Sequence, residues 1–352
     1  MTEIMSVNES KPELEVIRKA SDILQNNGTV VFPTETVYGL GANGLSSTAV
    51  QKIFDAKMRP NDNPLILHVH SLEQVNQIGI APKEFYQLAE KFWPGPLTMI
   101  IPKNDAIPHE VSRGLETVAV RMPDHSIALS VIREANLPIA APSANISGRP
   151  SPTSFEHVNS DLNGRVDMII DGGETGVGLE STVIDLSTKP FTILRPGGIT
   201  FEDLESVLTK ELLQTTAKIK SQDQTPKSPG LKYRHYAPKG ELFLVDGEGE
   251  RLLEKIKELV EKYSNQNYRV GVLVTDELKS YLTDNLSDLN HIYMYDLGPI
   301  DNLNQVAKNL YNGLREMDNN SVEIIFCRTF PKIGMGTALM NRLKKAARDR
   351  IL

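Results

Sequence analysis

Short apolar runs, each bounded by glycine, proline, asparagine or aspartate, recur along the first two-thirds of the chain. Runs of this kind, rich in β-branched residues and closed by turn formers, are typical of β-strands. They lie at Thr29–Pro33, Pro64–Val69, Leu97–Ile101, Val118–Met122, Leu137–Ala141, Val166–Asp171, Ser181–Leu186 and Phe191–Leu194. Several follow one another with no helical pattern between them, so the sequence predicts a mixed rather than a purely parallel sheet.

Apolar positions three or four residues apart predict amphipathic helices between some of these strands. Pro12–Asn27 carries its apolar residues on one face, and Gly28 follows it as a helix stop. Ser46–Met58 begins with serines suited to capping, and Ser126–Ala135 has the same apolar spacing. Together with the strands, these helices predict an α/β domain of about 200 residues.

The composition changes at Thr215–Pro238, which is poor in large aliphatic side chains and rich in lysine, glutamine, serine and proline, as linkers are. Beyond it, strands alternate with amphipathic helices, which predicts a smaller, mostly parallel Rossmann-like domain. The expected strands are Glu241–Val245, Tyr268–Val274, His291–Tyr295 and Val322–Cys327, and the expected helices are Glu250–Tyr263, Asn302–Met317 and Gly336–Arg348. The expected division is 1–214, a linker at 215–239, and 240–352.

Composition and charge exclude several classes of protein. A net charge of −7 argues against a large basic surface for nucleic acid, so tRNA binding is expected to be weak at most. Cys327 is the only cysteine, which excludes an internal disulfide and a cysteine-based zinc site. No apolar run approaches the ~20 residues of a membrane helix, and the acidic, polar N-terminus does not resemble a secretory signal. We therefore expect a cytoplasmic protein with no membrane association.

Glycines and cations indicate where phosphate groups could bind. Gly39–Gly44 carries a G-x-G-x-x-G pattern, but Thr34–Tyr38 separates it from its strand, so the context of a dinucleotide fingerprint is missing. Glycines in a bend close to a ligand remain an alternative. Lys57 and Arg59 follow at the end of a predicted helix, where cations could instead simply complement the helix dipole.

Polar loops at the ends of predicted strands supply the other candidates. Ala140–Thr153 clusters hydroxyls, an amide and turn formers, Glu180–Val183 places polar groups where a strand begins, and Leu194–Gly197 ends a strand with an arginine. Ligands of open α/β sheets bind beyond strand ends. Cations, hydroxyls and an amide without paired carboxylates suit charge neutralisation of a triphosphate more than acid–base work. We expect Mg²⁺ bound with the nucleotide, mainly through phosphate oxygens and water, and no metal site of the protein's own.

The segments PTETVYGLG, KxRPxxNPL, TVAVRMP, APSANISGxPSPT, GxESTVIDL and ILRPG, in this order and spacing, resemble the YrdC-type domain of threonylcarbamoyl-AMP synthases. SPGLKYRHYAP and GxGTALMNRLKKAA resemble the long, two-domain form of that family. The resemblance covers almost the whole chain. It implies a YrdC-like α/β domain with a mixed, twisted sheet and a smaller Rossmann-like α/β domain.

The same resemblance implies an activity. A nucleotidyltransferase of this family converts L-threonine, bicarbonate and ATP into threonylcarbamoyl-AMP (an L-threonylcarbamoyladenylate) and pyrophosphate. The product would pass to a tRNA threonylcarbamoyl transferase, which modifies the adenosine next to the anticodon to threonylcarbamoyladenosine (t6A).

Roles for individual residues follow from the matched motifs. The catalytic set implied by the resemblance is Lys57, Arg59, Ser143 and Asn145. The ATP-binding set is Arg59, Asn63, Thr117, Ser143, Asn145, Ser151, Arg195 and Tyr236. The threonine-binding set is Thr36, His68, Arg121, Ala141 and Ser181, with Arg121 holding the carboxylate. The expected lid, which would exclude water from a mixed anhydride, is Lys232, Tyr233, His235 and Tyr236.

Alternative interpretations remain open. His68, taken alone, fits a packed core histidine as well as a ligand-binding one. A YrdC-like domain could also serve as a tRNA-binding or assembly module without catalysis, which the negative charge disfavours. Carbamoyl-adenylate chemistry of the hydrogenase-maturation type is another possibility, but such proteins normally carry zinc-finger segments that one cysteine cannot form. The basic helix at Gly336–Arg348 could be solvated, dock on the first domain or contact the transferase.

Overall fold

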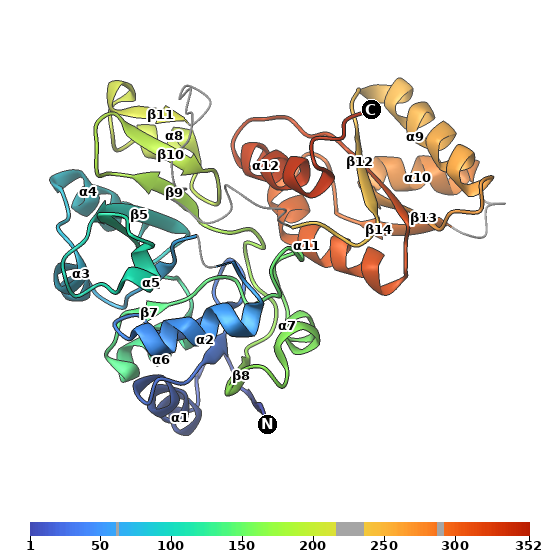
Figure 1. Cartoon of the computed structure of the whole chain (residues 1–352). Coiled ribbons are helices and arrows are strands. Elements are labelled where there is room, and N and C mark those ends of the chain that lie inside the picture. The colour runs from blue at the N-terminus through green and yellow to red at the C-terminus, as the bar shows by residue number, and fades with distance from the viewer. Residues whose placement is uncertain (61–62, 216–235, 287–291) are drawn as a thin grey trace. The chain divides into compact units, whose positions relative to one another are not determined.

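The computed structural model of the chain describes all residues except 61–62, 216–235 and 287–291. It consists of two compact units (Figure 1). Unit 1 comprises Met1–Ser147 and Ser151–Tyr233, and unit 2 comprises Gly148–Pro150 and Arg234–Leu352. Within the described ranges, no helix is both long enough and apolar enough to cross a membrane.

The described part of unit 1 is built on a mixed, 11-stranded sheet. Its strands are β1 Glu3–Ser6, β2 Val30–Phe32, β3 Gly39–Asn43, β4 Ile66–His68, β5 Leu97–Pro102, β6 Thr117–Arg121, β7 Ile139–Ala140, β8 Met168–Asp171, β9 Thr182–Asp185, β10 Phe191–Arg195 and β11 Leu213–Thr215. They lie in the order β1-β8-β2-β3-β7-β4-β6-β5-β9-β10-β11. Because β4 is parallel to β6 while β5 is antiparallel to it, the predicted mixed sheet is confirmed.

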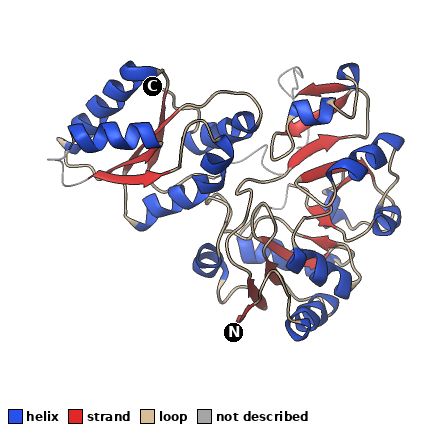
Figure 2. Cartoon of the chain, turned by 180° about the vertical axis from the view of Figure 1, so that it is seen from behind, coloured by secondary structure: helices blue, strands red, loops and turns tan. Residues whose placement is uncertain are grey.

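Helices cover both faces of this sheet because successive strand residues point to opposite sides (Figure 2). Val31 belongs to the core packed by α2, whereas Val30 and Phe32 belong to the core packed by α1 and α6. The helices are α1 Leu14–Gln25, α2 Ser47–Lys57, α3 Leu72–Ile78, α4 Lys83–Phe92, α5 His109–Ser112, α6 Ser126–Ala135, α7 Phe155–Leu162 and α8 Phe201–Glu205, with a 3-10 turn at Lys210–Leu212.

Close packing accounts for a glycine of the G-x-G-x-x-G pattern. Gly41 lies inside β3 rather than in a turn between strand and helix. A Cβ atom at Gly41 would lie 2.6 Å from Cε1 of Phe32 and 2.9 Å from Cγ2 of Ile139, both nearer than real Cβ contacts allow. Neighbouring strands therefore require a glycine at this position, and the approach of a ligand is not needed to explain it.

Unit 2 is a parallel α/β structure, as the sequence predicts. Its strands are β12 Glu241–Val245, β13 Val270–Val274, β14 Ile292–Asp296 and β15 Ile324–Arg328, in the order β12-β15-β13-β14. The pairs formed are all parallel. The helices are α9 Gly249–Ser264, α10 Asp276–Asn285, α11 Leu303–Asn319 and α12 Met335–Ala347. Helices α9 and α10 pack on one face of the sheet, and α11 and α12 pack against each other and against outer strands (Figure 2).

The tripeptide Gly148–Pro150 joins unit 2 although its neighbours along the chain belong to unit 1. The backbone N–H of Ala237 donates to the carbonyl oxygen of Gly148 at 3.1 Å. Arg315 Nη2 donates to the carbonyl oxygen of Pro150 at 2.6 Å, and the guanidinium is buried. Nothing in the sequence indicates this arrangement.

Candidate active site

Strand directions bring several predicted site residues to one edge of the sheet in unit 1. His68 and Arg121 end the parallel strands β4 and β6 and are register partners, so both side chains point to the same face. Strands β5 and β9 are parallel to each other, and β5 is antiparallel to β6, so β5 and β9 begin where β6 ends. Strand β10 is antiparallel to β9 and ends at the same edge with Arg195.

Ser181 forms the centre of a buried hydrogen-bonded group at this edge. Its Oγ lies 2.7 Å from Oγ1 of Thr98. Arg195 donates from Nη2 to Ser181 Oγ at 3.1 Å and from Nε to the Ser181 carbonyl oxygen at 3.0 Å. All three residues are buried. The structure thus joins Arg195, predicted on the ATP side, to Ser181, predicted on the threonine side. Thr98 was not predicted as a site residue. Its hydroxyl is the one polar side chain in the apolar run Leu97–Ile101, which could have indicated it.

Arg121 meets a carboxylate that the sequence did not single out. Its Nη2 lies 2.6 Å from Oε1 of Glu35, and the two side chains are only 5% and 12% exposed. Arg121 Nε donates to the carbonyl oxygen of Gly95 at 3.4 Å. Glu35 precedes Thr36 in the loop after β2, so this loop reaches the end of β6.

His68 is a neutral, buried imidazole in this site. Burial first, and then the positive charge of Arg121, lower the pKa of His68 to about 3. Its Nδ1 is buried and has no hydrogen-bond partner. A buried polar atom without a partner costs free energy unless a ligand or water satisfies it. The imidazole therefore fits hydrogen bonding to a ligand, and not service as a cation.

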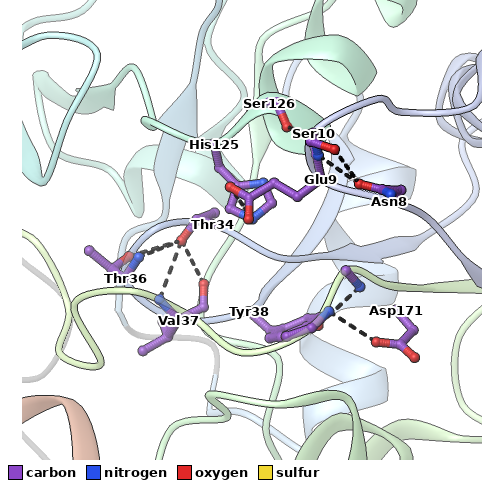
Figure 3. Close-up of polar contacts among 12 residues, drawn as sticks. Asn8, Glu9, Ser10, Thr34, Thr36, Val37, Tyr38, His125, Ser126 and Asp171 are labelled. Atoms are coloured by element: carbon purple, nitrogen blue, oxygen red, sulfur yellow. Dashed lines mark hydrogen bonds and ion pairs between the residues drawn. The ribbon is translucent and has the colours of Figure 1, made fainter.

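The other two predicted threonine-side residues lie on neighbouring backbone segments. Thr36 is fully buried, and its Oγ1 lies 2.9 Å from Oγ1 of Thr34. The Thr34 hydroxyl in turn donates to the carbonyl oxygen of Val37 at 2.7 Å, which closes the turn on itself (Figure 3). Ala141 follows β7, and its N–H donates to the carbonyl oxygen of Ile66 at 3.0 Å, which places it beside β4.

Lys57 fastens the end of α2 to the loop that carries Ser143 and Asn145. Its ammonium, on a side chain only 1% exposed, donates to both backbone carbonyls, at 2.6 Å for Asn145. Ser143 Oγ donates to Asn145 Oδ1 at 2.6 Å. Three residues of the predicted catalytic set are therefore in contact. Arg59, the fourth, is half-buried and follows Met58, which ends α2 in the left-handed conformation with φ 50°.

The remaining predicted ATP-side residues of unit 1 occupy separate places. Ser151 Oγ donates to Oε1 of Glu180 at 2.6 Å, both residues are buried, and Glu180 directly precedes Ser181. Asn63 is buried, and its Oδ1 has no hydrogen-bond partner. Thr117 begins β6, at the other end of that strand from the cluster. Their roles toward ATP stay predictions.

Part of the predicted lid lies outside the described residues, namely Lys232, Tyr233 and His235. Tyr236 belongs to unit 2, where its ring stacks on Tyr311 with centroids 5.5 Å apart and planes 30° apart. The guanidinium carbon of Arg342, whose side chain is fully buried, lies 5.7 Å from the centre of the Tyr236 ring. In the structure Tyr236 is thus a packed residue of unit 2, and its ATP-side role stays a prediction.

The unit 1 residues supply cations and hydrogen-bonding groups rather than a pair of carboxylates poised for acid–base catalysis. Arginine can grip a carboxylate or phosphate with two parallel hydrogen bonds. Such contacts gain strength where water is excluded. Among the residues that the structure describes, no group of three or more histidine, cysteine, aspartate or glutamate side chains could hold a metal ion. The chemistry that fits is positioning and charge stabilisation of an anionic substrate.

Comparison with known protein families agrees with this chemistry. A family model for Sua5, YciO and YrdC proteins, described as "Telomere recombination", matches residues 22–197. A second model, "Threonylcarbamoyl-AMP synthase, C-terminal domain", matches residues 199–348. Threonylcarbamoyl-AMP synthase of Pyrococcus abyssi is 46% identical over 353 residues, which cover 100% of this chain and 99% of that protein. The Bacillus subtilis protein of the same name is 46% identical over 355 residues, covering 100% and 97%.

Solved structures give the same result. The crystal structure of P. abyssi Sua5 complexed with L-threonine matches with a TM-score of 0.91 and 45% identity, and the match covers 100% of this chain and 99% of that one. Sequence and fold therefore agree over the full length with proteins of one named activity. It follows that the chain belongs to the threonylcarbamoyl-AMP synthase family and is an enzyme of the nucleotidyl-transfer type.

Proposed function

We propose that this enzyme converts L-threonine, bicarbonate and ATP into threonylcarbamoyl-AMP and pyrophosphate. The observation that carries the proposal is the buried cluster in which Arg121 and His68 lie beside the Ser181–Arg195 group. It offers two guanidinium cations and neutral hydrogen-bonding groups together, which suits a small hydroxylated amino acid joined to a phosphate. The threonine bound in the P. abyssi structure supports the same assignment.

On the threonine side, Arg121 would grip the substrate carboxylate with its guanidinium. The neutral imidazole of His68, with its unpartnered Nδ1, would bond to a polar group of the substrate. The buried hydroxyls of Thr36 and Ser181 lie on the surrounding segments and would complete the set. Buried polar groups that must be paired discriminate strongly against substrates lacking the matching hydroxyl.

The reaction we propose has two steps. The amine of threonine first attacks carbon dioxide derived from bicarbonate, forms the C–N bond and loses a proton, which gives a carbamate. A carbamate oxygen then attacks the α-phosphorus of ATP, and the bond to the β-phosphate oxygen breaks, so that pyrophosphate leaves. Catalysis of this kind rests mainly on positioning and on donors aimed at phosphate oxygens.

Residues of the loop after β7 would contact the nucleotide. Ser143 and Asn145 present polar side chains there, and Arg59 would supply positive charge. Lys57 donates to the loop carbonyls, so we propose that it holds this loop in shape as well as contributing charge nearby. The Oδ1 of Asn63 is buried and lacks a hydrogen-bond partner. The ligand, or a water bound to it, would donate a hydrogen bond to this oxygen.

Mg²⁺ would accompany ATP, held mainly by phosphate oxygens and water, as is usual for this ion. The side-chain oxygens of Ser143 and Asn145, near the proposed phosphate position, belong to a neutral hydroxyl and a neutral amide. Because neither is a carboxylate, they suit a metal ion that is held mainly by the nucleotide. When bound, the ion would neutralise charge on the departing pyrophosphate.

The product would serve tRNA modification in the cytoplasm, through a transferase that places the threonylcarbamoyl group on adenosine next to the anticodon. A net charge of −7 fits an enzyme that delivers a small product more than one that holds tRNA itself.

The test incubates the full chain with ATP, Mg²⁺, isotopically labelled bicarbonate and threonine, and measures pyrophosphate and the mass of the adenylate. Pyrophosphate should depend on both threonine and bicarbonate, and the adenylate should carry the label. Omission of either substrate, and serine in place of threonine, are the controls. Arg121→Met should abolish the signal, whereas the same change at the exposed Arg251 should not. If ATP binds but no combination releases pyrophosphate, the proposal fails.

A further inference from the structure

The proposed reaction does not use the carboxylate of Glu35, which faces Arg121 in the site. Its Oε1 lies 2.6 Å from Nη2 of Arg121, yet this contact lacks hydrogen-bond geometry. Both carboxylate oxygens of Glu35 are buried without a hydrogen-bond partner, and so is Arg121 Nη2. Two opposite charges therefore face each other away from water, and neither is fully satisfied by the other.

The backbone around Glu35 is fixed, while its carboxylate is held only by charge. The N–H of Val177 donates to the Glu35 carbonyl oxygen at 2.7 Å, and the N–H of Thr36 donates to Thr34 Oγ1 at 3.2 Å. His125, another titratable residue near Glu35, has its Nε2 3.5 Å from Oε1 of Glu9, and burial lowers its pKa (Figure 3). The Glu35 backbone is thus held independently of the carboxylate, whose oxygens have no hydrogen-bond partner to lose.

Charge matching identifies what can enter between Arg121 and Glu35. Separating a buried ion pair is costly if either charge loses its partner. A simple carboxylate would satisfy Arg121 but leave Glu35 buried and unpaired. An α-amino acid carries a carboxylate and an ammonium on the same carbon, so it can satisfy both charges at once. The pair therefore favours a zwitterion over a plain acid.

We propose that Glu35 is a substrate-binding residue that holds Arg121 in the empty site and, on binding, releases it to the substrate carboxylate and receives the substrate ammonium. This inference rests on the proposed function, since it takes threonine to be the substrate. Glu35 would favour an amino acid with a free ammonium over a 2-hydroxy acid of the same shape. The other threonine-side residues do not provide this discrimination.

The test compares two ligands that differ only at the α-position, L-threonine and 2,3-dihydroxybutanoate, which carries a hydroxyl in place of the ammonium. Calorimetric titration without ATP gives both dissociation constants for the wild-type chain and for Glu35→Gln. The quantity of interest is the dissociation constant of the hydroxy acid divided by that of threonine. This ratio should fall about tenfold or more in Glu35→Gln, because threonine loses a charged contact and the hydroxy acid no longer displaces a carboxylate.

Two further variants separate the charge from other effects. Glu35→Asp keeps the carboxylate and should keep a ratio near that of the wild type. Glu90→Gln makes the same chemical change on the exposed face of α4 and should leave the ratio unchanged. Thermal melting of each variant shows that it is folded.

The outcomes distinguish this inference from the proposed function. If the wild-type chain binds threonine but the ratio stays within about twofold in folded Glu35→Gln, Glu35 does not select the ammonium, and the proposed function stands. The inference is also overturned if Glu35→Asp loses the selection as fully as Glu35→Gln. If the wild-type chain binds no threonine at all, both the proposed function and the role of Glu35 fail.

Discussion

Replacing Lys57 with methionine tests whether one buried ammonium holds the loop of Ser143 and Asn145 in place. Methionine keeps the apolar stem and removes the charge. The ammonium donates to two backbone carbonyls. Hydrogen bonds to a charged group contribute about 1.5–3 kcal/mol each, so their loss costs about 3–6 kcal/mol. Removing the ammonium also removes the cost of burying its charge, which offsets part of this loss of stability. We expect the free energy of unfolding of unit 1 to fall by about 2–4 kcal/mol.

The chain contains a single tryptophan that reports on unit 1 by itself. Trp93 lies in unit 1, its Nε1 donates to the Leu97 carbonyl oxygen at 2.7 Å, and its ring packs edge-on against Phe85 at 5.2 Å. Unfolding in urea should change its fluorescence. With a slope of roughly 2–3 kcal/mol per molar urea, the midpoint of the transition should fall by about 1 M in Lys57→Met.

Lys52 provides the matched control, because it lies on the same helix with its side chain exposed. Lys52→Met should change the free energy of unfolding by no more than about 0.5 kcal/mol. If Lys57→Met unfolds at the same urea concentration as Lys52→Met, the ammonium does not stabilise the loop, and the reasoning from its two carbonyl contacts is refuted.

Three further predictions follow from burial and packing. The pKa of His68 is about 3 in the folded chain against 6.5 ordinarily, so the unfolded chain binds the proton first as the pH falls. Stability of unit 1, measured by tryptophan fluorescence in urea, should therefore fall as the pH drops from 6.5 towards 3, and less so in His68→Gln. Gly41→Ala should destabilise unit 1 by about 1–3 kcal/mol because its Cβ would lie 2.6 Å from the Phe32 ring. Gly176→Ala, whose Cβ would meet only an ordinary contact at 3.8 Å, is its control in the same urea titration. Burial raises the pKa of the Cys327 thiol to about 12, so Ellman's reagent should react with it only as the protein unfolds.

Each of these has a result that would contradict it. His68→Gln with the acid sensitivity of the wild type would show that this imidazole does not carry the pH dependence. Gly41→Ala as stable as Gly176→Ala would show that the strands relax at little cost. Cys327 reacting as fast in the folded chain as in urea would show that it is accessible.

Local patterns were enough to predict much of the fold. Ser126–Ala135 and Glu241–Val245 were predicted with the bounds that the structure gives them, because their apolar spacing is regular and turn formers close them. β3 was missed because its glycines leave no alternating side-chain pattern. β1, with the polar sequence EIMS, becomes a strand by pairing with β8, a partner far away in the sequence.

The candidate site shows the same limit. Strand ends and polar loops pointed to Ser143, Asn145, Ser181 and Arg195, and the structure joins them into two hydrogen-bonded groups. Glu35 was not predicted as a site residue, because its role depends on the positive charge of Arg121, which only the folded chain brings near it. A sequence shows which side chains are unusual in their own segment, whereas an ion pair between distant segments needs the fold.

The chain crosses between its two units after Ser147, after Pro150 and after Tyr233. A single cut at any position therefore cannot yield two complete units. After a cut that follows Tyr233, the C-terminal fragment would lack the carbonyls that accept hydrogen bonds from Ala237 and Arg315, and the N-terminal fragment would keep the tripeptide without those donors. Recombination at one point of the gene cannot transfer unit 2 without also transferring part of unit 1, so exchanging unit 2 alone between relatives requires two separate coding segments to move together.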